Sequence, residues 1–240
     1  MTKHLYIIGN GFDLHHGINS SYKNFQEWMH ENNPDVIEKV DEIYGFCDEE
    51  WWSDFENQLA SLDAIRYSSE IANENRPDLT SDHCDGMWTD AQIEVENQLE
   101  ELYSELRKCF REWIMNLNPP LESKKVKLII QDSIFINFNY TKTLENLYGI
   151  NQSNILHIHG CIDKYEDLIL GHGKSHEEIV ALNEEELPIL PKDLNEYELN
   201  QFYEERANSY ELHEQLARQA AISEWHCFSK KTCRRTVSYT

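Results

Sequence analysis

The stretch HLYIIGNGFDLHHGI, residues 4–18, decides the fold class of this chain. It opens with HLYIIG (4–9), a short apolar run rich in β-branched and aromatic residues, which predicts a buried strand. Gly9, Gly11 and Gly17 then indicate a tight turn into a helical block. A strand, a glycine turn and a helix are typical of α/β sheets, which bind ligands beyond the carboxyl ends of their strands.

Apolar periodicity predicts the elements further along the chain. Helical spacing is present over residues 22–32, 34–44, 49–63, 88–117 and 142–149. Strand-like runs occur at residues 126–130, 134–138, 154–158 and 167–171. We expect a loop over residues 67–87 and mostly helical, acidic chain over 175–223. Together these patterns predict an α/β fold with a parallel-sheet core and helices inserted into it or packed around it.

Composition restricts the classes of function. The 240 residues carry 44 acidic and 21 basic side chains, for a net charge of −23. Such a field repels phosphate backbones, so broad nucleic-acid binding is not expected, although a nuclease with a local basic groove stays open. No apolar run approaches the roughly 20 residues that cross a bilayer, and residues 1–9 do not form a secretory signal. The six cysteines include no CxxC pair, which favours reduced thiols over a disulfide framework or a structural zinc site. We expect a soluble, cytoplasmic protein.

The first candidate site is the turn Gly9-Asn10-Gly11. Glycines let a phosphate approach backbone amides closely. The dinucleotide fingerprint GxGxxG is absent because residue 14 is leucine, and a tight turn without a ligand stays open as the alternative.

The second candidate is FINFNYTKTLE, residues 135–145. Strand alternation places Asn137 and Asn139 on one face, with Phe138 opposite. Asn139 falls at the strand end, before a helix that Thr141 is suited to cap. The alternative is that these polar side chains only satisfy the turn backbone.

The third candidate is NILHIHGCID, residues 154–163. His157 and His159 are expected on one face, and Gly160 follows directly. We expect His159 to be open to a ligand as a general base and His157 to be a satisfied core histidine. Metal ligation by both histidines is the alternative. LGHGKSH, with His172, is a fourth glycine-rich strand end, for which a turn without function is the alternative.

Five segments in order resemble the AbiH-type bacteriophage abortive-infection proteins. They are IIGNGFDLHHGINSSYKNF, WWSDFENQLASLD, FINFNYTKTLENLYGI, ILHIHG and LILGHG, within residues 4–173. These proteins in turn resemble sirtuin-like NAD-binding domains, whose opening G-A-G-I-S-x-x-x-G-I-P is similar in spacing to GNGFDLHHGIN (9–19). The sirtuin asparagine at a strand end is echoed by Asn139, and the histidine preceding a glycine by His159.

The resemblance implies a Rossmann-like, sirtuin-like core and an anti-phage protein that binds and hydrolyses NAD, with Asn139 and His159 as the catalytic pair. NAD would be substrate or ligand, and no further cofactor or metal is implied. The contacts to it would come from Gly9, Asn10, Gly11, Asp13, Gly17, Tyr140, Thr141, His157 and Gly160. Two departures are Thr141, where sirtuins have aspartate, and Asp13, where they have serine. The zinc-binding CxxC pairs of sirtuins are missing, so deacetylation is not expected.

The resemblance also suggests how one domain, residues 1–240, is organised. Residues 1–30 and 122–175 would form the nucleotide-binding core, 31–121 a helical insertion and 176–223 an acidic helical segment. Residues 224–240 lie in SEWHCFSKKTCRRTVSYT, which is expected to be either a genuine basic tail or a truncated end that lacks part of the site.

Two other functions stay open. One is a metal-dependent nuclease or phosphohydrolase that uses Asp13, His157 and His159. The other is a nucleotide-sensing module without catalysis of its own. The expected partners are NAD or a related nucleotide and either a second copy of the chain or another defence protein.

Overall fold

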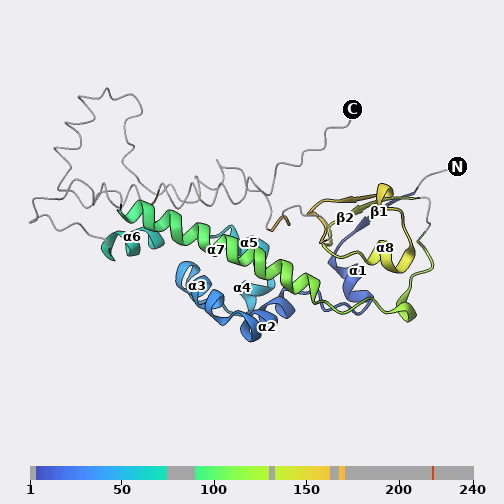
Figure 1. Cartoon of the computed structure of the whole chain (residues 1–240), viewed down its shortest axis with the longest axis horizontal. Helices are drawn as coiled ribbons and strands as arrows, with labels where there is room; N and C mark the ends of the chain where they lie inside the picture. Colours follow the sequence, from blue (N-terminus) through green and yellow to red (C-terminus); the bar gives the residue numbers. More distant parts are fainter. Residues whose placement is uncertain (1–3, 75–89, 130–132, 163–167, 171–217, 219–240) are drawn as a thin grey trace, which may run out of the picture. The chain divides into compact units, whose positions relative to one another are not determined.

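A computed structural model describes residues 4–74, 90–129, 133–162, 168–170 and 218 (Figure 1). The chain divides into two compact units, each described by itself. Unit 1 contains residues 1–59, 104–172 and 231–240, and unit 2 contains residues 60–103 and 173–230. Among the described helices, none is both long and apolar enough to cross a membrane.

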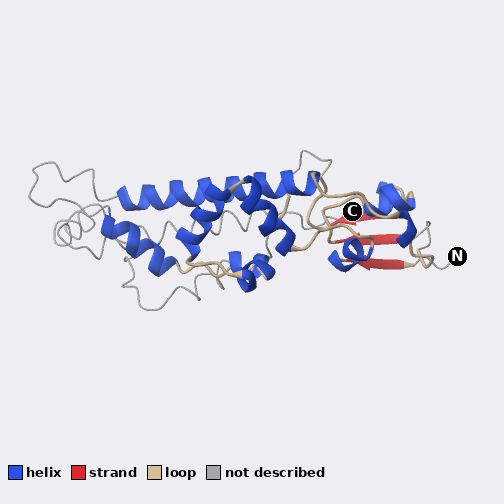
Figure 2. Cartoon of the chain, turned by 90° about the horizontal axis from the view of Figure 1, so that it is seen from below, coloured by secondary structure: helices blue, strands red, loops and turns tan. Residues whose placement is uncertain are grey.

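Unit 1 contains a three-stranded parallel sheet in the order β1-β2-β3, and Figure 2 shows its strands side by side. The strands are β1 (Leu5–Ile8), β2 (Ile134–Asn137) and β3 (Ile155–His157). Ile8 is in register with Asn137, and Asn137 with His157. The carboxyl ends of all three strands therefore meet at one edge, and the predicted strands near 4–9, 134–138 and 154–158 are confirmed.

Two short helices adjoin the strands. Helix α1 (Asn10–His15) follows β1, and α8 (Thr143–Tyr148) connects β2 to β3. Helix α8 ends at Gly149 in the left-handed conformation, with φ of 66°, as the glycine predicted. One face of the sheet packs with α8 in a cluster of buried residues: Ile8, Phe135, Leu144, Leu147, Tyr148 and Ile150.

The prediction that β1 is buried is wrong for one of its faces. Ile8 is buried and Tyr6 packs against the same cluster, but Ile7 is 69% exposed and Leu5 is exposed as well. Alternation along the strand sends these two side chains to the opposite face. An apolar run thus predicted the strand correctly and its burial only in part.

The helices of unit 1 include α2 (Tyr22–Asn32) and α3 (Pro34–Tyr44), which confirm two predictions. The side chain of Ser21 caps α2 by accepting the Asn24 N–H at 3.2 Å. Pro34 occupies the first turn of α3, where its missing N–H leaves no helical hydrogen bond unmade.

The single helix predicted over residues 49–63 is wrong. The chain instead forms α4 (Glu49–Ser53), capped by Asp48, and α5 (Phe55–Leu59). Asp54 separates them with φ of −113° and ψ of 34°, and its side chain accepts a hydrogen bond from Asn57 at 2.6 Å. Aspartate side chains that bond locally in this way compete with helical backbone bonds.

Aromatic side chains form the helical core of unit 1. The ring of Phe25 lies 6.0 Å from Trp52, 5.6 Å from Phe55, 5.2 Å from Phe110 and 5.1 Å from Trp113, all measured between centroids. Helix α7 (Asp90–Met115) supplies the last two residues from its C-terminal part. The aromatic periodicity in these helices therefore reflects packing, as the spacing predicted.

Unit 2, as far as it is described, contains α6 (Ala64–Glu74) and the N-terminal part of α7. The loop predicted over 67–87 is wrong for residues 67–74, and residues 75–87 lie outside the described part. Ala64, Tyr67, Ser68 and Ile71 keep helical spacing and are buried, despite the polar residues between them. The prediction of a helix over 88–117 is confirmed over residues 90–115.

Three further predictions concern the rest of the chain. Residues 126–129 of the predicted strand 126–130 do not form a strand. Two of their backbone groups are hydrogen-bonded to side chains instead of to a neighbouring strand. The Val126 N–H donates to the Tyr148 hydroxyl, and the Leu128 carbonyl accepts from the Tyr6 hydroxyl, both at 2.7 Å. Residues 168–170 of the predicted strand 167–171 are not in a strand. His172, the tail 224–240 and nearly all of 175–223 lie outside the described residues.

Candidate functional site

A cavity of about 310 Å³ opens where the carboxyl edge of the sheet meets the aromatic core of unit 1. Its walls come from α1, α2, α5, α7, the segment 138–141 that follows β2, Ser20 before α2 and the turn after β3. The lining residues are Asn10, Asp13, Ser20, Tyr22, Glu56, Phe110, Trp113, Ile114, Phe138, Asn139, Tyr140, Thr141 and His159. Segments more than 100 residues apart in sequence therefore converge on one volume.

Asp13 on α1 lines this cavity and is only 1% exposed. Its carboxylate accepts hydrogen bonds from the Thr141 hydroxyl at 2.5 Å and the Thr143 hydroxyl at 2.7 Å. Burial raises the pKa of Asp13, and hydrogen bonds from both threonines and from Asn139 oppose that shift. The bond to Asp13 also corrects the prediction that Thr141 caps α8, whose N-cap residue is Lys142.

Asn139 connects two strand ends. Its Nδ2 donates to the carbonyl of Gly9 at 3.1 Å, and its N–H donates to Oδ1 of Asn137 at 3.1 Å. Asn137 and Asn139 are buried while Phe138 is exposed, which confirms the predicted alternation. Asn139 is held in one orientation by these bonds while lining the cavity.

His159 lies on the turn that follows β3, with its ring centroid 5.7 Å from those of Phe138 and Tyr140. Its Nδ1 is buried and has no hydrogen-bond partner among the described residues. Burial lowers the pKa of His159, and the charge of Glu56 opposes this. A neutral imidazole that lines a cavity can accept a hydrogen bond or a proton from a bound molecule.

His157 has different surroundings. Its Nε2 lies 3.0 Å from Oε1 of Glu145 on α8, and its Nδ1 lies 3.4 Å from Nδ2 of Asn137. The prediction that His157 and His159 share a face is wrong, because β3 ends at His157 and the chain turns at residues 158–159. The prediction that His157 is a satisfied, internal histidine is confirmed.

The sequence did not point to Tyr22 and Glu56 as site residues. The Tyr22 hydroxyl donates to Oε1 of Glu56 inside the cavity, and burial raises the pKa of Tyr22. No local motif marks them, because they reach the cavity from two different helices, α2 and α5.

The glycines divide into two kinds. Gly17 has φ of 79°, a backbone conformation that favours glycine, and a Cβ there would lie 2.9 Å from Cδ1 of the exposed Leu121 side chain, which would have to shift. At Gly9 and Gly11 a Cβ would meet no atom of the described residues within 4 Å, and φ is not in the left-handed region. Packing within the chain therefore does not explain why these two positions are glycine.

The cavity brings together six of the residues that sequence reasoning selected: Asn10, Asp13, Asn139, Tyr140, Thr141 and His159. The other five lie outside its lining: Gly9, Gly11, Gly17, His157 and Gly160. The assignment of catalytic and ligand-binding roles to these residues stays a prediction.

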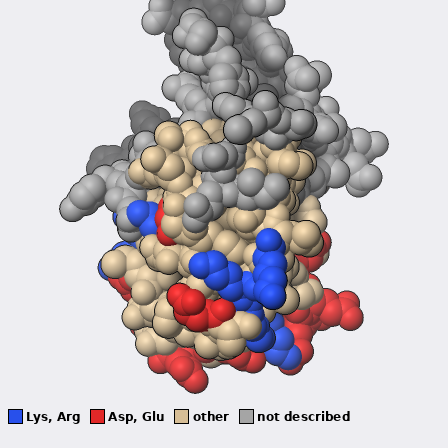
Figure 3. Space-filling view, turned by 90° about the vertical axis from the view of Figure 1, so that its right-hand side faces the viewer, with Lys and Arg blue, Asp and Glu red and all other residues tan. Residues whose placement is uncertain are grey.

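The electrostatics of the cavity are acidic. Asp13 and Glu56 contribute carboxyl groups, and the described part of the chain places no lysine or arginine in the lining. On the face of the molecule in Figure 3, basic side chains of the described residues form a small group with acidic ones beside it, rather than a continuous basic surface. The cavity therefore favours cationic or neutral groups over phosphate.

The ligand set proposed for a metal-dependent nuclease does not form. His157 is engaged by Glu145, whereas Asp13 and His159 line the cavity. Within the described residues, the group of side chains able to hold an ion is Glu145, His157 and Cys161.

In a comparison with known families, the family model described as "Bacteriophage abortive infection AbiH" matches residues 5–233. Comparisons with curated proteins and with solved structures find no match.

Proposed function

Because the chain belongs to the bacteriophage abortive infection AbiH family, we propose that it defends its host against phage by hydrolysing NAD in the acidic cavity of unit 1. The observation that carries this proposal is the convergence of Asn139 and His159 with Asp13 and Glu56 on one cavity at the carboxyl edge of a parallel sheet. The same convergence supports the sirtuin-like interpretation of the core.

The charge and shape of the cavity support a particular end of NAD as the bound group. The nicotinamide ring of oxidised NAD is flat and positively charged, and Trp113, Phe110 and Tyr22 supply aromatic surface. Glu56 supplies a negative charge. The volume, about 310 Å³, is at the lower end of the ~300–1,000 Å³ typical of small-molecule pockets. We therefore propose that the nicotinamide–ribose end enters, while the diphosphate stays at the cavity mouth.

The reaction breaks the bond between the ribose C1′ and the nicotinamide nitrogen. That nitrogen keeps the bonding electron pair, so nicotinamide leaves as a neutral molecule and a positive charge develops on the ribose. The carboxylates stabilise this charge, as carboxylates do in glycoside hydrolysis. Water then adds to C1′ and gives its proton to the imidazole of His159, which lines the cavity.

Asn139 serves as a positioning residue in this proposal. Its Nδ2 bond to the Gly9 carbonyl fixes the turn that follows β1 against the end of β2. The open space around Gly9 and Gly11 leaves room for the ligand's phosphates to approach the backbone.

The test uses the purified full-length chain, incubated with NAD in the presence and absence of lysate from phage-infected cells, with products separated by chromatography. We expect the wild type to release nicotinamide and ADP-ribose in a 1:1 ratio. The surface control His15→Ala should release as much of each as the wild type. His159→Ala should release neither. Absence of nicotinamide under every condition, or equal release by His159→Ala, would contradict the proposal.

A further inference from the structure

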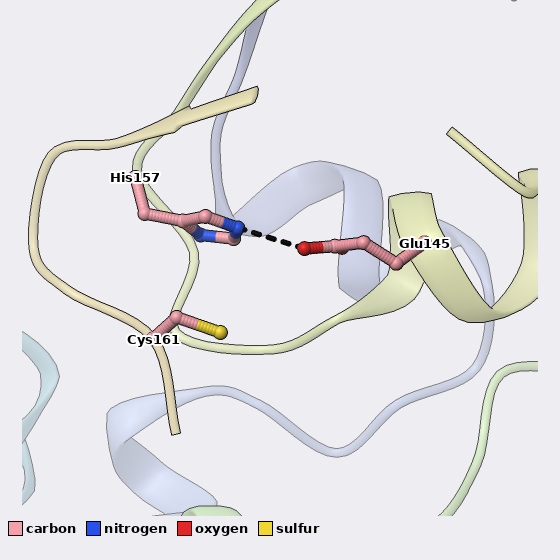
Figure 4. Close-up of side chains that lie close together, drawn as sticks. All are labelled: Glu145, His157 and Cys161. Atoms are coloured by element: carbon pink, nitrogen blue, oxygen red, sulfur yellow. Dashed lines mark hydrogen bonds and ion pairs between the residues drawn. The ribbon is translucent and has the colours of Figure 1, made fainter. Parts of the chain in front are cut away.

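A second polar cluster lies in unit 1, apart from the cavity. Glu145 on α8, His157 at the end of β3 and Cys161 shortly after it turn their side chains toward one another (Figure 4). The ligand atoms of the three all lie within 4.8 Å of one another. The side chains of His157 and Glu145 are 7% and 14% exposed, and Cys161 is 1% exposed. The cluster is thus shielded from solvent.

One atom of the cluster is left unsatisfied. Oε1 of Glu145 contacts His157, but Oε2 is buried and has no hydrogen-bond partner among the described residues. A buried carboxylate oxygen without a donor is costly, and buried charges are normally paired or coordinate metals. Oε2 of Glu145 is therefore able to bind a cation.

The donor set matches zinc. Zinc takes histidine nitrogen and carboxylate oxygen at about 2.0–2.2 Å and cysteine sulfur at about 2.3 Å, in tetrahedral geometry. Ligand atoms around such an ion lie roughly 3.3–3.7 Å apart, from these bond lengths. The atoms here already lie within 4.8 Å, and Nε2 of His157 is 3.0 Å from Oε1 of Glu145. Small shifts of the three side chains would place their ligand atoms at three corners of a tetrahedron around the ion.

We propose that Glu145, His157 and Cys161 bind one zinc ion, with water as the fourth ligand. The ion would connect α8 to the segment after β3. His159 lies between two of the ligands in sequence, so the ion would fix the turn that carries it. This assignment differs from the expectation of no metal site, which relied on the absence of CxxC pairs, and it is independent of what the cavity binds.

Asn137 offers a way to strengthen the site. Zinc on Nε2 of His157 places the histidine proton on Nδ1, which faces Nδ2 of Asn137 at 3.4 Å, a donor rather than an acceptor. Oδ1 of Asn137 already accepts the Asn139 N–H. In Asn137→Asp one oxygen keeps that bond and the other accepts the Nδ1 proton. A carboxylate that accepts the second ring proton of a ligating histidine raises metal affinity. Removing such a partner typically lowers the affinity about 10–100-fold.

The experiment titrates the chelator-treated, reduced full-length chain with zinc or cobalt alone, and measures affinity by competition with a chromophoric chelator. We expect the wild type to bind one more equivalent than Cys161→Ser and His157→Ala, and its cobalt form to show thiolate-to-cobalt charge-transfer absorption. Cys109→Ser, another buried cysteine of unit 1, should behave like the wild type. Asn137→Asp should bind more tightly.

Glu145→Gln is the safeguard against misfolding, because it keeps the shape of the side chain while removing its charge. Circular dichroism should show it folded, and its zinc affinity should fall at least tenfold. Equal zinc binding by the wild type, folded Glu145→Gln and Cys161→Ser would overturn the proposal. So would a cobalt complex of the wild type without a thiolate band.

Discussion

His157 and His159 are two residues apart, yet their surroundings are opposite. His157 contacts Glu145 and Asn137 and is shielded, whereas His159 lines a cavity with its Nδ1 unpartnered. The end of β3 at His157 and the turn at residues 158–159 produce this separation. The comparison shows that two neighbouring histidines acquire different chemistry from what the fold places beside each ring: a carboxylate beside His157 and a cavity beside His159.

The largest expected effect tests this comparison directly, with an alanine variant of each histidine. His159→Ala should lower NAD turnover roughly 10²–10⁴-fold, the usual contribution of a general base, without changing the melting temperature. His157→Ala should instead destabilise unit 1 by roughly 3 kcal/mol, because it leaves the buried Glu145 carboxylate unpaired. Nicotinamide release and thermal unfolding, measured on both variants, check this. Interchanged results would refute the distinction.

Glu56→Gln tests the acidic character of the cavity. Removing the charge while keeping the shape should reduce kcat/KM for NAD roughly 10²-fold, comparable to losing one preorganised electrostatic contact in an active site. Glu49→Gln, a change at an exposed carboxylate of α4, is the matched control and should be neutral. Steady-state kinetics of both variants decide whether charge in the cavity matters.

The glycines extend the comparison to the turn after β1. Gly17→Ala should destabilise the fold by about 2 kcal/mol, from left-handed backbone strain and the contact with Leu121. Gly9→Ala should leave stability nearly unchanged, since its Cβ meets nothing, but should weaken NAD binding if a ligand approaches there. Denaturant unfolding and isothermal titration separate these effects. An unstable Gly9→Ala variant would assign that glycine to folding.

The smallest expected effect concerns Asp13. Burial raises its pKa in the folded chain, so the folded state holds a proton that the unfolded state loses. Its contribution is therefore fully present below the ordinary pKa of 3.8 and is lost as pH rises through the folded pKa. The melting temperature of Asp13→Asn relative to the wild type should increase from about pH 4 toward neutrality. A difference independent of pH would contradict this.

Local signals predicted much of the fold. Pro34 at the start of α3, Gly149 at the end of α8 and the apolar runs of the three strands each act over a few residues. The failures occurred where a distant partner decides the outcome. Val126 bonds to the hydroxyl of Tyr148, and Thr141 bonds to Asp13 instead of capping α8.

The candidate site was likewise predicted where local features decide it and missed where distant partners decide it. Asn139 and His159 were selected because parallel strand ends meet at one edge, which local pattern and fold class suffice to predict. Glu56 and Tyr22 were missed because they reach the cavity from helices whose packing no short motif encodes. The cluster of Glu145 with Cys161 was missed for the same reason, since α8 and the chain after β3 must first come together.

The central claim is that the cavity hydrolyses NAD during defence, and total NAD in phage-infected cells tests it most directly. Cells that carry the wild-type chain should lose most of their NAD before phage are released, while cells with His159→Ala keep it and lose protection. Protection by the wild type with NAD held at its uninfected level would contradict the account.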